Sequence, residues 1–547
     1  MPSTTAYHRA PLMDLSFMPL PDSNIQLEGN FQTQLTYTQN YFSKTTSPIN
    51  QVIFSKLYGT AMPSVQALPL PTNTNIKDYI QTLWAKSFSA IYAKDKQALL
   101  SVLESINALT DSLATFPESE LFPVSADLLR MVIDLYRRTG QATLLELLTK
   151  LRAILPDVSS MLSSFPFTTA YTPQNQNVPE NEKGYYERMQ RMATGCLTAD
   201  CVAISALFSQ FSGSAKERSS VKTGVTALQR YHGMPCGGFS ADPFLAGKDP
   251  ARALEIPAIA TQLQAYADAL MVTGDIDYAN LIELLYENAL SDVILEKGIR
   301  THVISNRLAN DETCQPTLPN QIEISALFKA MWTIRKTVWL AKDENTIAYM
   351  LPMDATCTTR MNNVPVRVIA HVKGTLNKSI HIRTLGKEAV GFKLQVRIPN
   401  YAIAPIISFA DGSKQEVPAG TLQNIQMVAG EEIYLTYQIR ERVEIGYRNS
   451  ISIFVGPLLM GLPILDNTMP WQYALIAGGT ISVSEENNRP IVHVVASSAP
   501  TWLDKNGFIA PPPQGLQAKS SYDLSLLPAR ENAGHICCFP VANSTNA

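Results

Sequence analysis

The side chains best suited to chemistry gather between Tyr231 and Cys314, around a glycine-rich loop and the start of a long helix. Asp242 ends the loop, where it could deliver a proton or simply form a turn. Glu255 precedes a helical stripe, where it could act as a base, bind a ligand or complement the helix dipole. Cys314 could be an unassisted nucleophile or inert packing. We predict these three residues as catalytic candidates.

Other histidines and cysteines give more ambiguous signals. His232 stands immediately before the glycine-rich loop, where its ring could bind a ligand or satisfy the loop backbone. Cys196 and Cys201 have no partner pair at metal spacing, which predicts packing roles. The run from His535 to Cys538, near the C-terminus, is a separate group that could bind a metal. No phosphate-binding loop, dinucleotide fingerprint or Ser-His-Asp order stands out.

Two consecutive helices have to hold these candidates in place. An apolar stripe predicts the first helix, Gly274 ends it and Asp275 caps the second. The stripe consists of Ile256, Ile259, Leu263, Tyr266 and Leu270. Further helical patterns begin at Ile76 and follow in close succession, and a last one covers 321–342. About ten helices in hairpin-like pairs favour an α/α toroid, although a plain helical array has the same local pattern.

Near Thr346 the hydrophobic period changes from the helical 3.6 to 2, the period of a strand. Short alternating runs follow, with turns at Asp411-Gly412 and Gly430-Glu431, which predicts an antiparallel sandwich. The predicted parts are listed in chain order. They are an extended segment at 1–75, an α/α barrel at 76–345, a β-sandwich region at 346–500 and an irregular tail at 501–547.

Composition sets the protein class. The 547 residues are 46% hydrophobic and 17% charged with a net charge of -3, an ordinary balance for two or three globular domains. Lys and Arg are scattered, so we expect no nucleic-acid partner. The longest apolar run, 454–465, contains Gly and Pro and is too short for a bilayer, so we expect no membrane association. The odd count of seven cysteines and the absence of a secretory pattern favour a cytoplasmic location.

A series of short sequence motifs, called words below, lies across residues 120–480. Their order is the one found in the β-L-arabinofuranosidase family of glycoside hydrolases, which the chain resembles. Each word alone is weak, but their shared order is specific. The words are His232-Gly233, Gly247-Lys248-Asp249-Pro250, Thr273-Gly274-Asp275, Tyr278-Ala279-Asn280, Asn288-Ala289-Leu290, Arg397-Ile398-Pro399 and Gly456-Pro457-Leu458.

The resemblance implies an α+β multidomain fold, in which an (α/α)6 barrel is followed by antiparallel β-sandwich modules. It also implies a retaining hydrolysis in which a zinc-bound cysteine thiolate attacks the anomeric carbon and a glutamic acid protonates the leaving oxygen. Zinc would remove the proton from the thiol. His302 stands where relatives carry substrate-facing polar residues, so we predict it as a substrate-binding residue together with His232.

The chain departs from the family where that chemistry would be carried. Pro243 occupies the acid position, and Pro257 replaces one cysteine ligand while Glu255 is kept. Cys314 matches one member of a cysteine pair, and a single sequence does not decide which. Zinc sites use three or four protein ligands, so zinc is conceivable but its family ligand set is incomplete. We therefore predict no family-type metal site and no other cofactor.

These observations predict an intracellular, glycoside-hydrolase-like enzyme with altered, zinc-independent chemistry. Its substrate would be a small cavity-bound molecule, a sugar or natural product, in specialised metabolism. Asp242 and Glu255 would exchange protons and His232 would orient the substrate. Two alternatives stay open: an active β-L-arabinofuranosidase-like glycosidase that uses Cys314, and a non-catalytic carbohydrate- or partner-binding protein.

Overall fold

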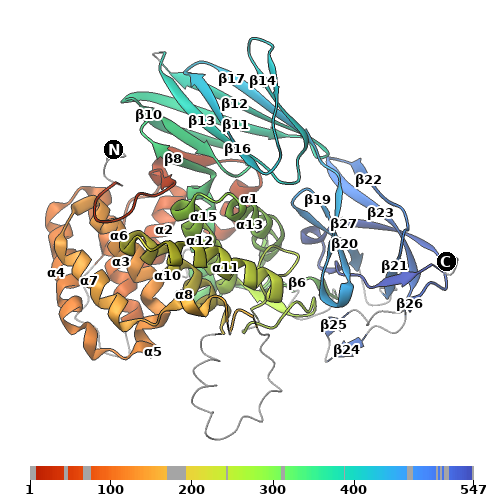
Figure 1. Ribbon diagram of the computed structural model, residues 1–547, viewed down its shortest axis with the longest axis horizontal. Helices are drawn as coiled ribbons and strands as arrows, with labels where there is room; N and C mark the ends of the chain where they lie inside the picture. The colour runs from red at the N-terminus through yellow and green to blue at the C-terminus, as the bar shows by residue number, and fades with distance from the viewer. Residues whose placement is uncertain are drawn as a thin grey trace, which may run out of the picture.

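The computed structural model describes most of the chain. The described residues are 8–41, 47–65, 76–164, 166–168, 193–241, 244–308, 315–386, 389–464, 472–499 and 516–544, with the backbone alone at 503–505 and 508–510. Figure 1 shows the helices grouped on one side, two sheets above them and a further sheet toward the C-terminus. The helical part and the sheets are therefore distinct regions of one molecule.

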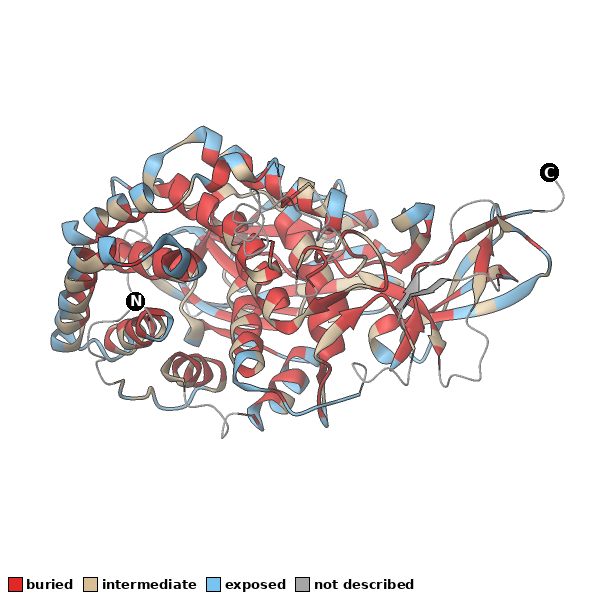
Figure 2. Ribbon diagram, turned by 90° about the horizontal axis from the view of Figure 1, so that it is seen from below, coloured by how far each residue is buried: buried red, intermediate tan, exposed pale blue. Residues whose placement is uncertain are grey.

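Six helices form a closed inner ring in which each packs against the next and the last returns to the first. They are α2 (Pro48–Tyr58), α3 (Ile76–Ala93), α6 (Ser125–Thr139), α10 (Gly195–Ser212), α12 (Ile256–Thr273) and α15 (Gln321–Val338). Outer helices pack against the ring: α1 (Asn30–Gln39), α4 (Lys96–Ser112), α7 (Ala142–Ile154), α11 (Ala215–His232) and α13 (Asp277–Leu285). Figure 2 shows their exposed positions along the outside of the helical part. The predicted α/α barrel is confirmed.

One ring helix, α10, is long and apolar enough to cross a membrane by length and composition alone. Most of it is buried in the protein, between α6, α11 and α12. Its first residue also needs to be small, because a Cβ on Gly195 would lie 2.1 Å from the Cβ of Ala241. The apolar character of α10 is therefore accounted for by its place in the barrel core.

Two sheets lie above the ring and pack face to face through a shared apolar core. The first has the order β1 (Met18–Pro19), β8 (Trp339–Asp343), β9 (Thr346–Tyr349), β13 (Gly391–Ile398) and β16 (Thr421–Val428). The second has the order β15 (Lys414–Glu416), β14 (Ile403–Phe409), β17 (Glu432–Gln438), β12 (Asn377–Gly386), β11 (Val364–Lys373), β10 (Ala355–Met361) and β2 (Ile25–Leu27). The β9–β13 pair is parallel and the other pairs are antiparallel. The predicted sandwich is confirmed for this region.

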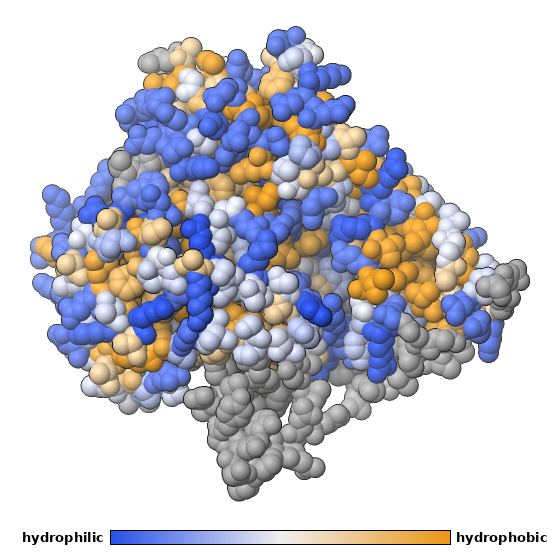
Figure 3. Space-filling view, in the orientation of Figure 1, coloured by the Kyte–Doolittle hydropathy of each residue, from blue (hydrophilic) through white to orange (hydrophobic). Residues whose placement is uncertain are grey.

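A third sheet follows toward the C-terminus. Its main path is β18 (Glu441–Ile445), β19 (Ile451–Val455), β20 (Leu458–Ile464), β27 (Tyr522–Pro528), β23 (Arg489–Ser498), β21 (Tyr473–Ile476), β29 (Val541–Asn543) and β26 (Leu516–Gln517). Attached to it are β22 (Ile481–Glu486), β28 (Gly534–Ile536) and β7 (Asn306–Arg307), the last from the helical region. Figure 3 shows apolar side chains gathered over β20, β23 and β27 on one face.

The structure corrects the predicted organisation at both ends. Residues 8–65 contain β1, β2, α1 and α2 rather than an extended segment, and α2 belongs to the inner ring. Its sequence hides the helix because Asn50 and Ser55 lie among the buried apolar residues, and packing rather than propensity stabilises so short a helix. The tail predicted to be irregular contributes β27, which lies between β20 and β23 inside the third sheet.

Candidate functional site

Glu255 and His302 face each other at the N-terminal end of α12. Strand β3 (Ala253–Glu255) pairs antiparallel with β6 (His302–Ile304), in a register that sets Glu255 opposite His302. Glu255 Oε1 lies 3.6 Å from His302 Nε2, and Thr301 Oγ1 lies 2.7 Å from His302 Nδ1. Their side chains are 35% and 25% exposed, so an added molecule can reach both. The strand pair thus joins two residues that the sequence predicts as functional.

The position of Glu255 frees its carboxylate for chemistry. It is the N-cap residue of α12, yet its side chain accepts no hydrogen bond from the helix backbone. Pro257, in the first turn, lacks one of the N–H groups that a cap would bind. The carboxylate therefore lies near the positive end of the helix dipole while its oxygen faces an imidazole.

His232 is fully buried, with both ring nitrogens bound to backbone. Nδ1 accepts a hydrogen bond from Gly247 N at 3.2 Å, so Nε2 carries the proton and donates to Pro166 O at 3.2 Å. Burial lowers the pKa of His232 to about 4, which keeps the ring neutral. This geometry matches the alternative in which the histidine satisfies the loop, and it makes His232 a positioning residue of the loop over 233–247.

The rest of the glycine-rich loop is also held firmly. The Gln262 side chain exchanges two hydrogen bonds with the backbone of Phe239, at 3.0 and 3.1 Å. Ala241 forms a bridge with Leu254, the residue before Glu255. Asp242 comes next in the chain but lies outside the described residues, as Cys314 does. Their catalytic roles stay predictions.

Cys196 belongs to the neighbourhood of Glu255, although the sequence predicts only a packing role. Its thiol shares a hydrogen bond with Thr261 on α12. Burial, with a contribution from the negative charges of Asp200 and Glu255, raises the pKa of this thiol to about 11. A thiol with so high a pKa is protonated and therefore a poor nucleophile. Cys196 therefore lies where the charges of both carboxyl groups are felt, without taking part in the chemistry itself.

Asp200 is a functional candidate that the sequence pattern does not reveal. It stands one turn after Cys196 on α10, with a side chain 15% exposed, and its ion-pair partner Arg130 Nη1 is 4.0 Å away. Burial raises the pKa of Asp200 to about 7; Arg130 opposes the shift and Asp127 adds to it. Asp200 can therefore hold or release a proton near neutral pH. The i, i+4 spacing of Cys196 and Asp200 is the one sequence signal that could have found it.

The raised pKa of Asp200 predicts a pH-dependent stability. The ordinary value is 3.8 and the folded value about 7, so the folded protein binds this proton more tightly. Its stabilising effect is complete below about pH 4 and lost as the pH rises through about 7. In Asp200→Asn this loss disappears, so the Tm difference between variant and wild type should become more positive from about pH 5 to about pH 8. The exposed Asp111→Asn serves as the control, and a pH-independent difference for Asp200→Asn would contradict the assignment.

The described residues alone do not complete the zinc site that the family resemblance implies. Zinc needs three or four protein ligands, and among the described residues no group of three His, Cys, Asp or Glu side chains is arranged to hold a metal. Glu255 and His302 offer two donors and Pro257 offers none. His535, Cys537 and Cys538 are buried in a different place, where the backbone N–H groups of both cysteines donate to Asn306 Oδ1 at 2.9 Å.

Several of the short words that carry the family resemblance contact one another across the barrel–sheet boundary. Arg397 of β13 donates to Asn280 and Glu283 of α13, and Tyr401 donates to Glu283. Glu283 is therefore buried, whereas its i, i+4 pairing with Glu287 predicts a solvated face. Asn288 lies in a π-helical turn, Tyr286–Leu290; it donates to Pro457 O at 2.7 Å and accepts from Leu459 N at 2.8 Å. These words are structural and do not touch Glu255.

Comparison with solved structures shows the same fold in glycoside hydrolases. A glycoside hydrolase matches with a TM-score of 0.71 at 14% identity, over 99% of both chains. A GH127 β-L-arabinofuranosidase from Geobacillus stearothermophilus matches with a TM-score of 0.62 at 13% identity, over 94% of this chain and 93% of that one. A second GH127 β-arabinofuranosidase matches with a TM-score of 0.57 at 12% identity, over 97% and 99%. The sequence itself matches no protein-family model and no curated protein. The resemblance is thus confirmed at the level of the fold.

Proposed function

We propose that this chain is an intracellular enzyme that acts on a small molecule at the N-terminal end of α12, without a zinc-bound thiolate, in specialised metabolism. The observation that carries the proposal is the Glu255–His302 pair, a carboxylate and an imidazole 3.6 Å apart on paired strands. Such a pair is suited to general acid–base catalysis. The glycoside-hydrolase fold supplies a scaffold that has hosted this class of chemistry, although fold by itself does not set the reaction.

In this proposal Glu255 removes a proton from the bound molecule or from water, and His302 holds the carboxylate in position and carries a proton. Thr301 fixes the ring of His302 through Nδ1. Asp200, which exchanges its proton near neutral pH, is the candidate acid. A pair of carboxyl groups, one of them an acid, is the arrangement that glycosidases use.

Cells with and without the gene provide the test, by untargeted metabolite comparison. We expect one compound to accumulate in the deletion strain, to disappear when the wild-type gene is restored, and to persist when Glu255→Gln is restored instead. Identical metabolite profiles in all strains would reject the enzyme proposal and favour the binding-protein alternative.

Metal content separates this proposal from an active β-L-arabinofuranosidase, the second candidate that the GH127 neighbours favour. We expect purified protein to contain substoichiometric zinc and to keep its Tm in a chelator, because the described residues around Glu255 supply two donors. An aryl β-L-arabinofuranoside should be stable with the protein, with or without added zinc. One equivalent of tightly held zinc, with turnover abolished by Cys314→Ala, would replace our proposal with the second candidate.

A further inference from the structure

Charged side chains meet inside the helical ring. Lys329 of α15 donates to Asp127 of α6 at 2.7 Å, and Arg130 of α6 donates to Asp268 of α12 at 2.7 Å. Because α6 is a ring neighbour of neither α15 nor α12, both contacts have to cross the interior. The ring is therefore not closed by an apolar core alone.

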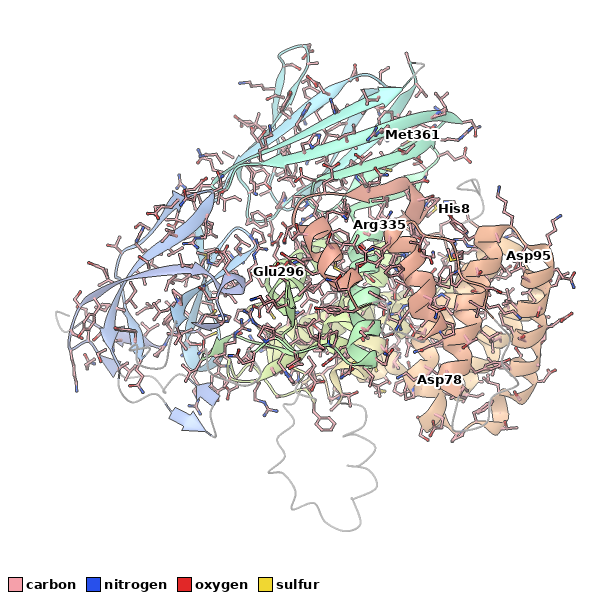
Figure 4. All side chains as sticks on the ribbon, turned by 180° about the vertical axis from the view of Figure 1, so that it is seen from behind. His8, Asp78, Asp95, Glu296, Arg335 and Met361 are labelled. Atoms are coloured by element: carbon pink, nitrogen blue, oxygen red, sulfur yellow. The ribbon has the colours of Figure 1, made fainter. Side chains whose placement is uncertain are left out.

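An aromatic wall borders these charges. The rings of Trp84 on α3 and Trp332 on α15 have centroids 6.1 Å apart. Lys56 of α2 and Lys336 of α15 place their ammonium groups 5.1 Å and 4.5 Å from the Trp332 ring. Figure 4 shows Arg335, next to Lys336, beneath the sheets, and Asp78, in the first turn of α3, at the opposite edge of the helical part. The aromatic rings and the lysines beside them therefore belong to the same helical ring as the charged contacts.

The interior retains space for solvent or a ligand. Side chains that point into it keep exposed area: 19% for Asp127, 15% for Asp200 and 14% for Lys329. Exposed area inside a ring means that space of at least the size of water adjoins these groups. Spaces enclosed between packed helices are among the places where small molecules bind.

Two buried hydrogen-bond donors in this interior have no partner among the described residues, and a half-buried lysine lies near them. Arg130 Nη2 and Gln264 Nε2 are unpaired, on side chains that are 90% buried or more. Gln264 lies four residues before Asp268 on the same face of α12, so it points toward Arg130. Lys336 is half-buried, close to Asp268 and Arg130, without a carboxylate at ion-pair distance. Unpaired buried donors are costly unless an acceptor fills the space between them.

The balance of charge in the interior also favours an anionic ligand. Among the described residues of this interior, four acidic side chains, of Asp22, Asp127, Asp200 and Asp268, lie near five basic ones, of Lys56, Arg130, Lys329, Arg335 and Lys336. The guanidinium of Arg335 donates hydrogen bonds to the backbone carbonyls of Asp22, Ile25, Lys56 and Leu57. Lys56, Lys329 and Arg130 are paired with Asp22, Asp127 and Asp268. Arg335 and Lys336 are the cations of this group without an ion pair to a described carboxylate, and of the two only Arg335 has backbone acceptors.

We infer that the interior of the ring binds a small molecule bearing a carboxylate, which accepts hydrogen bonds from Arg130 Nη2, Gln264 Nε2 and Lys336 Nζ. The carboxylate supplies the missing acceptor atoms and the missing negative charge together. Trp84 and Trp332 offer apolar surface to the rest of the molecule. The inference goes beyond the proposed function, because Gln264 lies more than two turns further along α12 than Glu255.

Binding of matched acid and neutral probes tests this inference without any turnover. The pairs are D-glucuronate with D-glucose, D-galacturonate with D-galactose, and benzoate with benzyl alcohol, measured by thermal shift and calorimetry on the whole chain. We expect at least one acid to raise the Tm of the protein while its neutral partner does not. Lys336→Met should weaken the binding of that acid by about tenfold or more, since a hydrogen bond between charged groups is lost.

The same variant separates a ligand-binding lysine from a structural one. If Lys336 is an unpaired cation until an anion binds, Lys336→Met removes an uncompensated charge. The ligand-free variant should then melt at a higher temperature than wild type. A lower Tm would indicate a structural lysine and overturn the inference, as would a panel in which no acid binds better than its partner. The exposed Lys342→Met is the matched control and should change neither quantity. If Glu255→Gln still binds the acid but no strain accumulates a metabolite, the binding site stands and the enzyme proposal fails.

Discussion

Replacing Glu255 by Gln should reduce conversion of the compound that accumulates in the deletion strain by about 10²- to 10⁴-fold. Gln keeps the size of the side chain and its contact with His302, but it can no longer take up a proton. We expect the Tm to stay close to that of wild type, because the carboxylate forms no capping hydrogen bond with α12. The loss of its charge at the helix N-terminus costs about 0.3–1 kcal/mol of stability. Rate and Tm are measured on the same purified preparation.

Glu296→Gln is the matched control for this variant, since Glu296 is an exposed glutamate in the same region of the chain, on the turn between two short strands. It should leave both rate and Tm unchanged. His302→Asn provides the complementary change. If the two residues act as a unit, the double variant is no slower than the slower single variant. Unaltered turnover in Glu255→Gln would remove Glu255 from the reaction and with it the observation on which the proposed function depends.

The helical part of the fold could be predicted where one helix face is uniformly apolar. Residues 125–139 and 142–154 repeat Leu, Ile and Val with the helical period, and the structure has α6 and α7 there. The helix over 321–342 is found as well, but it ends at Val338 because Trp339 starts β8. The change of period near Thr346 correctly separates helices from sheets. These predictions succeed because each segment carries its own pattern of burial.

The predictions fail where tertiary contacts rather than local pattern decide. The helix α1 reads NFQTQLTYTQ, with polar residues throughout, and is held against α15. In β27 the alternation of Leu524 and Leu526 is present, but the proline-rich run before it favours an irregular tail. Such segments cannot be assigned from one sequence because the partner that buries them is far away in the chain.

The candidate site, too, could be predicted from the sequence only in part. The sequence singles out Glu255 and His302 separately, and the β3–β6 register makes them a pair. Asp200 escapes notice because its significance depends on Asp127, Arg130 and Asp268, which belong to other ring helices. A lone aspartate in an apolar helix carries no sequence signal beyond its i, i+4 spacing from Cys196 until the ring closes. The interior charges and the β3–β6 pairing therefore had to come from the structure, whereas the helix that follows Glu255 could be predicted from its apolar stripe.

The second large effect concerns stability and tests the interface between barrel and sheets. Arg397 and Glu283 have side chains that are 1% and 6% exposed, and they form an ion pair. Arg397 also donates to Asn280. Removing one partner of a buried pair leaves the other charge uncompensated, which costs about 3–5 kcal/mol. We therefore expect Arg397→Met to lower the stability of the whole chain by about that amount, measured by chemical denaturation and by Tm.

The double variant Arg397→Met with Glu283→Met distinguishes a buried charge effect from lost packing. Since no charge is then left unpaired, it should lose less stability than Arg397→Met alone. Arg442 is the matched control, because it pairs with Glu444 on the surface, with side chains 34% and 51% exposed. Arg442→Met should cost about 0–1 kcal/mol. If Arg397→Met costs no more than this control, the contacts between the short words would be incidental. The fold would then owe its barrel–sheet geometry to apolar packing alone, and the order of those words would be no sign of a shared architecture.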